Sequence, residues 1–155
     1  MSTRQVSRPL GGQHTEILVQ FFADRVLVIV TQLSKVGTLI QASIPDTAPL
    51  LPAPEPNSQY PNQQPMPLPS PAIQLTPLIG SSPSEHMHTL HSLYASQIAT
   101  IIWTQAALNA PGTSRRSVVV GLALKKSDGP NEEEVTEQEK ELFQGVMSAL
   151  LELLK

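Results

Sequence analysis

Arg25-Val-Leu-Val-Ile-Val-Thr-Gln32, closely followed by Lys35-Val-Gly-Thr-Leu-Ile40, is the most informative stretch of the chain. Its first half holds five consecutive aliphatic residues, a composition that favours a β-strand. Side chains of a strand alternate between two faces, so one face receives Val26, Val28 and Val30 and the other receives Leu27, Ile29 and Thr31. Both faces are largely apolar, and both therefore need a cover. A chain of 155 residues can cover one face with its own helices, and we infer that a second protein covers the other.

The same two-sided pattern occurs again near the end of the chain. Residues 117–125 are predicted to form a strand in which one face carries Val118, Val120 and Leu122. The opposite face carries Val119, Gly121 and Ala123, whose small size indicates that something packs very closely there. The sequence does not assign either face to the helices. With the face left unassigned, the predicted partner interface consists of Leu27, Ile29, Thr31, Val118, Val120 and Leu122.

The remaining patterns predict one α+β domain over residues 1–155. Strands are expected over residues 15–22, 25–32, 38–43, 72–78 and 117–125, with a short further strand around 5–8. Connections of two to five residues between the first strands favour antiparallel pairing. We therefore expect an antiparallel sheet of five to six strands with two main helices packed on one face, and a dimer that stacks sheet on sheet.

Two segments have the apolar spacing of helices, residues 84–109 and 131–154. The first is expected to begin after an N-cap at Ser84, and the second after Asn131 with Glu134 as its capping partner. The predicted buried stripe of the first helix consists of Leu90, Tyr94, Ile98, Ile101, Ile102 and Leu108.

A proline-rich tract separates the two halves of the domain, because 12 of the 15 prolines lie between Pro45 and Pro83. Proline removes an amide donor and restrains the residue before it, so residues 45–71 are expected to form a disordered, proline-rich insertion. A tolerated insertion is the simpler interpretation, since lengthening a surface loop costs little entropy. The alternative is a ligand for SH3-like modules, as Pro65-Met-Pro-Leu-Pro69 fits a polyproline helix, but no basic residue flanks it.

No set of residues in the sequence points to catalysis. The chain has no cysteine, which excludes disulfides, thiolate catalysis and cysteine-based zinc sites. The sequence also has no nucleophile elbow and no phosphate-binding glycine motif. His86, His88 and His91 are clustered but lack the His-Glu-x-x-His pattern, so we interpret them as ordinary residues of a helix start. We expect a protein that is not an enzyme and holds no metal and no cofactor.

Charge and hydropathy argue against nucleic-acid and membrane partners. The basic residues do not cluster, and only three Phe, two Tyr and one Trp are available for stacking. Residues 131–155 carry a net charge of −5, which we assign to a helix start and its solvated face. No secretory signal is recognisable, and no apolar run approaches the roughly 20 residues that span a bilayer. The expected localisation is cytoplasmic, with the nucleus left open.

The stretch Val26-Leu-Val-Ile-Val-Thr-Gln-Leu-Ser-Lys-Val-Gly-Thr-Leu-Ile40 resembles the central hairpin of the proteasome assembly chaperone 3 family. The family pattern is an aliphatic run followed by six positions that are matched here by Thr31, Gln32, Lys35, Gly37, Thr38 and Leu39. Ser117-Val-Val-Val-Gly-Leu-Ala-Leu-Lys-Lys126 and Ile73-Gln-Leu-Thr-Pro-Leu-Ile79 resemble two further strands of the family. The departure from the family is the proline-rich insertion, and we expect a fungal-type member.

The resemblance implies a non-catalytic chaperone of early 20S proteasome assembly. Members of the family form a dimer, typically with the related assembly chaperone 4, and the pair supports α-ring formation by contacting an α subunit, α5. The implied partners are therefore assembly chaperone 4, or a second copy of this chain, and α5. No α-subunit contact residue can be carried over, because the resemblance offers no motif for it.

Two other classes of protein stay open. A roadblock-like or longin-like dimeric scaffold of a trafficking or signalling complex also combines a sheet with helices. A minor enzyme that uses His14 or His88 is the third class. A list of co-purifying proteins would separate all three classes.

Overall fold

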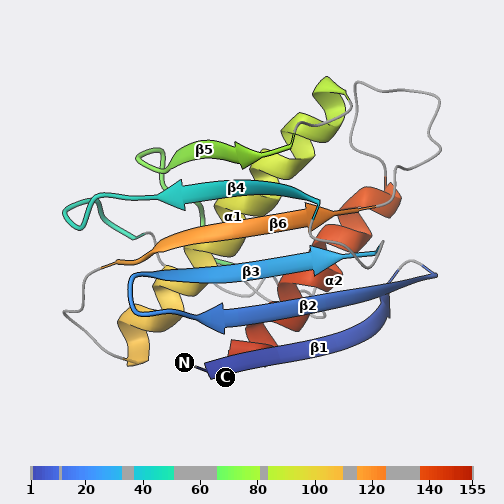
Figure 1. The fold of residues 1–155 in the computed structure, drawn as a ribbon, viewed down its shortest axis with the longest axis horizontal. Helices are drawn as coiled ribbons and strands as arrows, with labels where there is room; N and C mark the ends of the chain where they lie inside the picture. The colour runs from blue at the N-terminus through green and yellow to red at the C-terminus, as the bar shows by residue number, and fades with distance from the viewer. Residues whose placement is uncertain are drawn as a thin grey trace, which may run out of the picture.

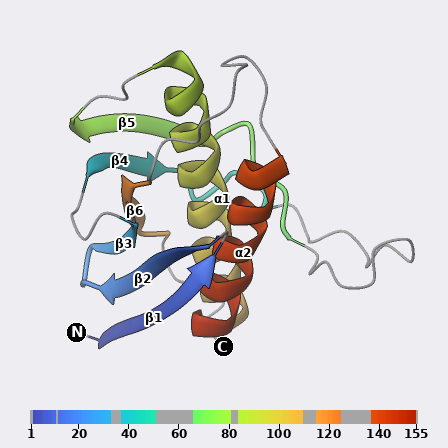
Figure 2. The ribbon, with the colours of Figure 1, turned by 90° about the vertical axis from the view of Figure 1, so that its right-hand side faces the viewer.

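The computed structural model describes residues 2–10, 12–32, 37–50, 66–80, 84–109, 115–124 and 137–154. The elements along the chain are β1 (Ser2–Leu10), β2 (Gln13–Phe21), β3 (Arg25–Thr31), β4 (Thr38–Ser43), β5 (Gln74–Ile79), α1 (Glu85–Asn109), β6 (Ser117–Ala123) and α2 (Glu137–Leu154). The strands form one six-stranded sheet, and both helices lie on the same face of it (Figure 1 and Figure 2). The predicted α+β class, with two helices on one face, is confirmed.

The strand order of the sheet is β1-β2-β3-β6-β4-β5. Neighbouring strands run antiparallel except β3 and β6, which are parallel. The expectation of a purely antiparallel sheet, with β3 paired to β4 across their short connection, is wrong because β6 lies between these two strands. β3 and β6 are apolar on both faces, and such strands are most stable at the centre of a sheet, where each has a neighbour on both sides.

Gly37 explains how β4 can begin beside the end of β6. Its φ is +71°, a conformation that residues with a side chain rarely adopt. A Cβ atom at this position would lie 2.2 Å from the carbonyl oxygen of Leu122 and 2.8 Å from the Cβ of Ala123. The position therefore excludes any side chain. This steric limit explains why the Gly-Thr-Leu string begins with glycine.

The hydrophobic core lies between the sheet and the two helices. The strand residues at the centre of this core are at most 5% exposed, and they are Ile17, Val19, Val26, Val28, Val30, Ile40, Ala42, Val118, Val120 and Leu122. Tyr94 of α1 packs edge-to-face on Phe143 of α2, with ring centroids 5.0 Å apart. The predicted stripe of α1 is confirmed except at Leu108, which is 70% exposed because the last turn of the helix extends past the core.

The start of α1 is capped as predicted. The Ser84 Oγ accepts a hydrogen bond from the Met87 amide at 3.2 Å, and the Ser84 carbonyl accepts one from the His88 amide at 3.0 Å. The predicted cap of the second helix, Asn131 with Glu134, lies outside the described residues. Within the described residues α2 begins at Glu137.

Both ends of the proline-rich tract are held against the domain. The Arg115 guanidinium donates hydrogen bonds to the carbonyls of Pro45 (2.8 Å) and Ala48 (2.5 Å). At the other end, the Gln97 amide donates to the carbonyl of the buried Pro67 at 2.8 Å. Residues 51–65 lie outside the described residues, so for them the disordered insertion stays a prediction.

β5 follows the tract and lies at the edge of the sheet, as predicted. Pro77 is tolerated there, because an edge strand leaves one row of backbone groups unpaired. None of the described helices is long and apolar enough to cross a membrane.

Candidate partner interface

The face of the sheet opposite α1 and α2 carries no described helix (Figure 2). The strand register shows what this open face presents. Leu18 lies opposite Ile29, Ile29 opposite Gly121, Gly121 opposite Leu39, and Leu39 opposite Ile79. These five residues form a continuous row that crosses β2, β3, β6, β4 and β5, and we call it the apolar row.

A second row lies beside the apolar row and is apolar only at its centre. Leu27 lies opposite Val119, with Gln20 and Gln41 as the flanking partners on β2 and β4. The large apolar side chains of the two rows form what we call the open-face patch, which consists of Leu18, Leu27, Ile29, Leu39, Ile79 and Val119.

Charged side chains are scarce on the open face. Among the described residues of β2, β3, β4, β5 and β6, the ionisable side chains on this face are His14 and Glu16, near the start of β2, and Arg25, the first residue of β3. Depletion of charge around an apolar centre is typical of the core of a protein interface. The composition of the face therefore favours contact with another protein over contact with water.

The exposure of these side chains reflects their size. Leu18, Leu27, Ile29 and Leu39 are partly exposed, and Ile79 is 63% exposed at the edge strand. Val119 and Ala123 are only 6% and 5% exposed, although no helix covers them, because their short side chains lie between longer neighbours. The centre of the open face therefore consists of small residues that longer neighbouring side chains shield from solvent.

The structure places the six predicted interface residues on two different faces. Leu27, Ile29 and Thr31 lie on the open face, whereas Val118, Val120 and Leu122 face the helices and are at most 1% exposed. The parallel register is the reason, because it sets Val28 beside Val120 and Ile29 beside Gly121. A partner cannot reach the three β6 residues without displacing the helices.

Four residues of the open-face patch were not predicted: Leu18, Leu39, Ile79 and Val119. The alternation in residues 13–21 and 38–43 was the available signal for the first two. This signal was not sufficient, because alternation sorts the residues of one strand into two faces. It does not tell which of these faces lies on the same side of the sheet as Ile29.

Among the described residues the histidines are not gathered into a metal-binding group. Within these residues there is no group of three or more His, Asp or Glu side chains placed to hold a metal ion. The Nε2 of His86 lies 2.7 Å from the Oε2 of Glu139, and this largely buried pair joins α1 to α2. His91 is 3% exposed, and its burial lowers its pKa. His88 and His14 are exposed, and they lie on different elements.

Known proteins resemble this chain in part of the sequence and in the whole fold. No protein-family model matches the chain. Proteasome assembly chaperone 3 of Nematostella vectensis is 42% identical to it over 40 residues, which make up 26% of this chain and 30% of the relative. The match therefore spans less than a third of that relative's length.

A solved structure, described as "Crystal Structure of a Novel Chaperone Complex for Yeast 20S Proteasome Assembly", matches with a TM-score of 0.53 at 9% identity. The match covers 100% of both chains, and at this identity it shows the fold alone. The local sequence match concerns the same family as the Thr-Gln-x-x-Lys-x-Gly-Thr-Leu string, and the solved structure shares the fold over the whole chain. The resemblance of this chain to the proteasome assembly chaperone 3 family is therefore confirmed.

Proposed function

We propose that this chain is a non-catalytic chaperone of early 20S proteasome assembly that works as one half of a sheet-on-sheet dimer. The observation that carries the proposal is the open-face patch, which is apolar, poor in charge and not covered by either helix. A contiguous apolar surface on a small domain is a signature of an interaction site. The sequence match to proteasome assembly chaperone 3 and the fold match support the proteasome as the context.

Sheet stacking is the arrangement by which a second protein would cover the open face. Stacked sheets pack about 10 Å apart with their side chains interleaved. At the centre of the face Val119 and Ala123 are already shielded by their longer neighbours, so the partner would pack on the partly exposed side chains of Leu18, Leu27, Ile29 and Leu39. Completing the burial of each partly exposed leucine or isoleucine would stabilise the dimer by on the order of 1 kcal/mol. The proposed partner is the related assembly chaperone 4, or a second copy of this chain.

The dimer would use its outer surfaces for the α subunit. With the two open faces buried against each other, the helices and the sheet edges stay accessible to α5, and this contact would support α-ring formation. Release follows when later subunits occupy the same surface, a steric mechanism that needs no nucleotide and no active site. The identities of the dimer partner and of α5 come from the family resemblance, and we place the chaperone in the cytoplasm with the nucleus left open.

Affinity purification of the tagged full chain from its own cells, followed by mass spectrometry, tests the proposal. We expect the related chaperone and proteasome α subunits to co-purify, and we expect Ile29→Glu to lose both because it buries a charge in the stacked sheets. Gln138→Glu is the matched control, since it adds the same charge at an exposed position of α2, on the opposite side of the sheet from the open face.

The same experiment separates the alternatives. Subunits of a trafficking or signalling complex in place of proteasome subunits would favour a roadblock-like or longin-like scaffold. A wild-type chain that retains no proteasome component and no related chaperone would refute the proposal.

A further inference from the structure

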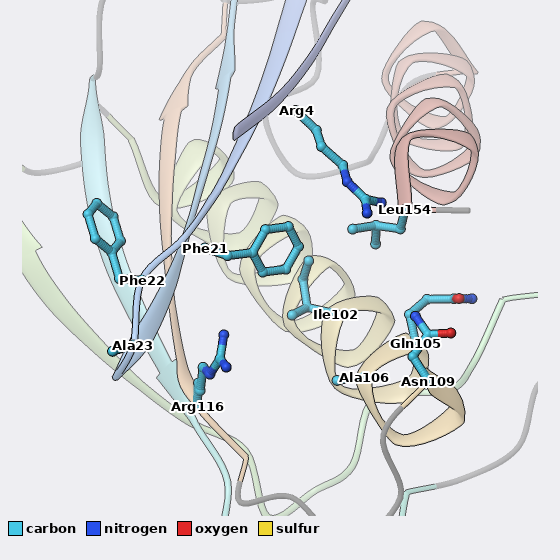
Figure 3. Close-up of a pocket in the computed structure, with 10 residues that line it drawn as sticks. All are labelled: Arg4, Phe21, Phe22, Ala23, Ile102, Gln105, Ala106, Asn109, Arg116 and Leu154. Carbon is cyan, nitrogen blue, oxygen red and sulfur yellow. The ribbon is translucent and has the colours of Figure 1, made fainter. Parts of the chain in front are cut away.

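A cavity of about 680 Å³ lies on the helix side of the sheet, away from the open face (Figure 3). The end of β2, the start of β6 and the last turns of α1 and α2 converge there. Its apolar wall is formed by Phe21, Ile102 and Leu154. A volume of this size lies within the range of small-molecule and cofactor sites.

Two arginines line the cavity, Arg4 of β1 and Arg116 just before β6. Figure 3 shows their guanidinium groups extending toward the apolar wall from different sides. The Arg4 guanidinium donates a hydrogen bond to the Leu153 carbonyl at 3.0 Å and lies 5.8 Å from the centroid of the Phe21 ring. The Arg116 carbonyl accepts a hydrogen bond from the Trp103 indole at 2.7 Å, which fixes the position of this residue.

The charge balance of the cavity favours a ligand with one negative charge. No acidic residue is among the described residues that line it, and neither arginine forms a salt bridge with a described residue. The two guanidinium groups supply a charge of +2, while the C-terminal ends of α1 and α2 each present about half a negative charge. The sum is about +1, which suits a carboxylate better than a phosphate with its charge of about −2.

We propose that this cavity binds the C-terminal residue of a peptide chain, through its free carboxylate and an apolar side chain. The carboxylate pairs with the Arg116 guanidinium and lies within the field of Arg4. The apolar side chain packs on Phe21, Ile102 and Leu154. The side-chain amides of Gln105 and Asn109, in the last turns of α1, line the same cavity and can pair with the N–H and C=O groups of the peptide.

A C-terminal residue fits better than an internal acidic side chain. It presents a carboxylate, an apolar side chain and a backbone N–H within one residue, which matches the arginines, the apolar wall and the amides of one cavity. An internal Asp or Glu would bring the carboxylate without the apolar group. The site is independent of the proposed dimer, because it uses residues of the helix side and none of the open-face patch.

Fluorescence anisotropy with the full chain tests the site. The probes are labelled hexapeptides of the sequence Gly-Ser-Gly-Ser-Gly-X, with X as Leu, Ile, Val or Phe, each with a free carboxylate or a C-terminal amide. We expect saturable binding of the free acids, weakened at least tenfold by the amide, since a charge-assisted hydrogen bond contributes enough for a ten- to hundredfold change. Arg116→Gln should cause a similar loss. Lys140→Gln, which removes one positive charge from the exposed start of α2, should cause none.

Several results would overturn the proposal. They are the absence of saturable binding by every free acid, equal affinity for acid and amide, and unchanged affinity in Arg116→Gln. Tighter binding of an amidated peptide with an internal Asp would also overturn it, because it would assign the site to acidic side chains. Ile29→Glu should keep the peptide affinity, so failure of the dimer and failure of this site give different results.

Discussion

Ile29 of β3 lies directly opposite Gly121 of β6 in the parallel pair at the centre of the sheet. This register decides which side chains the chain buries by itself. It sets Val28 and Val120 together under the helices, and Leu27 and Val119 together on the open face. A shift of one residue would exchange the two faces of β6. The surplus apolar surface of the molecule therefore lies on one defined side.

Gly37→Ala should destabilise the domain strongly. The new Cβ would meet the Leu122 carbonyl at 2.2 Å, and the backbone would keep a φ of +71°, so β4 and β6 would have to separate. We expect a loss of about 3 kcal/mol or more in the free energy of unfolding, measured by urea denaturation.

Gly12→Ala is the matched control for this substitution. Gly12 also has a positive φ, 78°, but a Cβ there has nothing within 4 Å. Its cost should be about 1 kcal/mol, from the backbone conformation alone. Similar costs for both substitutions would show that the contact with Leu122 is not the constraint.

The strands could be located from the sequence because the signals for them are local. Alternation and short turns placed β4 at the residues that the structure shows, and the N-cap at Ser84 placed the start of α1. The position of β6 between β3 and β4 could not be predicted, because it depends on pairing between residues that are far apart in the chain. For the same reason the sequence could not tell which face of β6 lies beside Ile29, and the structure sets Ile29 beside Gly121, with Val118, Val120 and Leu122 on the other face.

His86→Ala should destabilise the contact between the helices. Glu139 is 8% exposed at its side chain and would lose its partner at 2.7 Å, which leaves a buried carboxylate with less compensation. We expect a loss of about 2 kcal/mol at pH 7, measured by chemical denaturation. His88→Ala, in the same turn but exposed, should change stability by less than about 0.5 kcal/mol. Equal effects of the two substitutions would contradict the role of the pair.

His91 should make the protein less stable at mildly acidic pH. Burial, with a smaller contribution from His88, lowers its pKa below the ordinary value of 6.5. The unfolded chain therefore binds more protons as the pH falls below 6.5, so stability decreases in that range, by up to about 1.4 kcal/mol per pH unit. The pKa of Asp24 is also lowered, by its hydrogen bond to Arg25. Its titration changes stability only at pH values near and below 3.8, its ordinary pKa, and so does not interfere in this range.

Denaturation curves at pH 7.0 and pH 5.5 measure this effect in the wild type and in His91→Gln. The wild type should lose more stability between the two values than the variant does, by about 1 kcal/mol. Equal losses in both proteins would rule out His91 as the titrating group.

Residues 51–65 should contribute little to the stability of the domain. Replacing them with a Gly-Ser segment of equal length should shift the Tm by less than about 2 °C, since a flexible surface loop has a small entropic cost. Arg115→Ala should lower the free energy of unfolding more, by about 1–2 kcal/mol, because it removes the hydrogen bonds to Pro45 and Ala48 that hold the start of the tract. Thermal unfolding distinguishes the two, and a larger loss from the loop replacement would contradict this account.

The molecular mass of the native protein purified from its own cells tests most directly whether a second protein covers the open face. Native mass spectrometry should show the wild type and Gln138→Glu as dimers, either with the related chaperone or with a second copy. Ile29→Glu should appear at the mass of one chain, with its far-UV circular dichroism unchanged. A wild-type protein that is a stable single chain under these conditions would contradict the account.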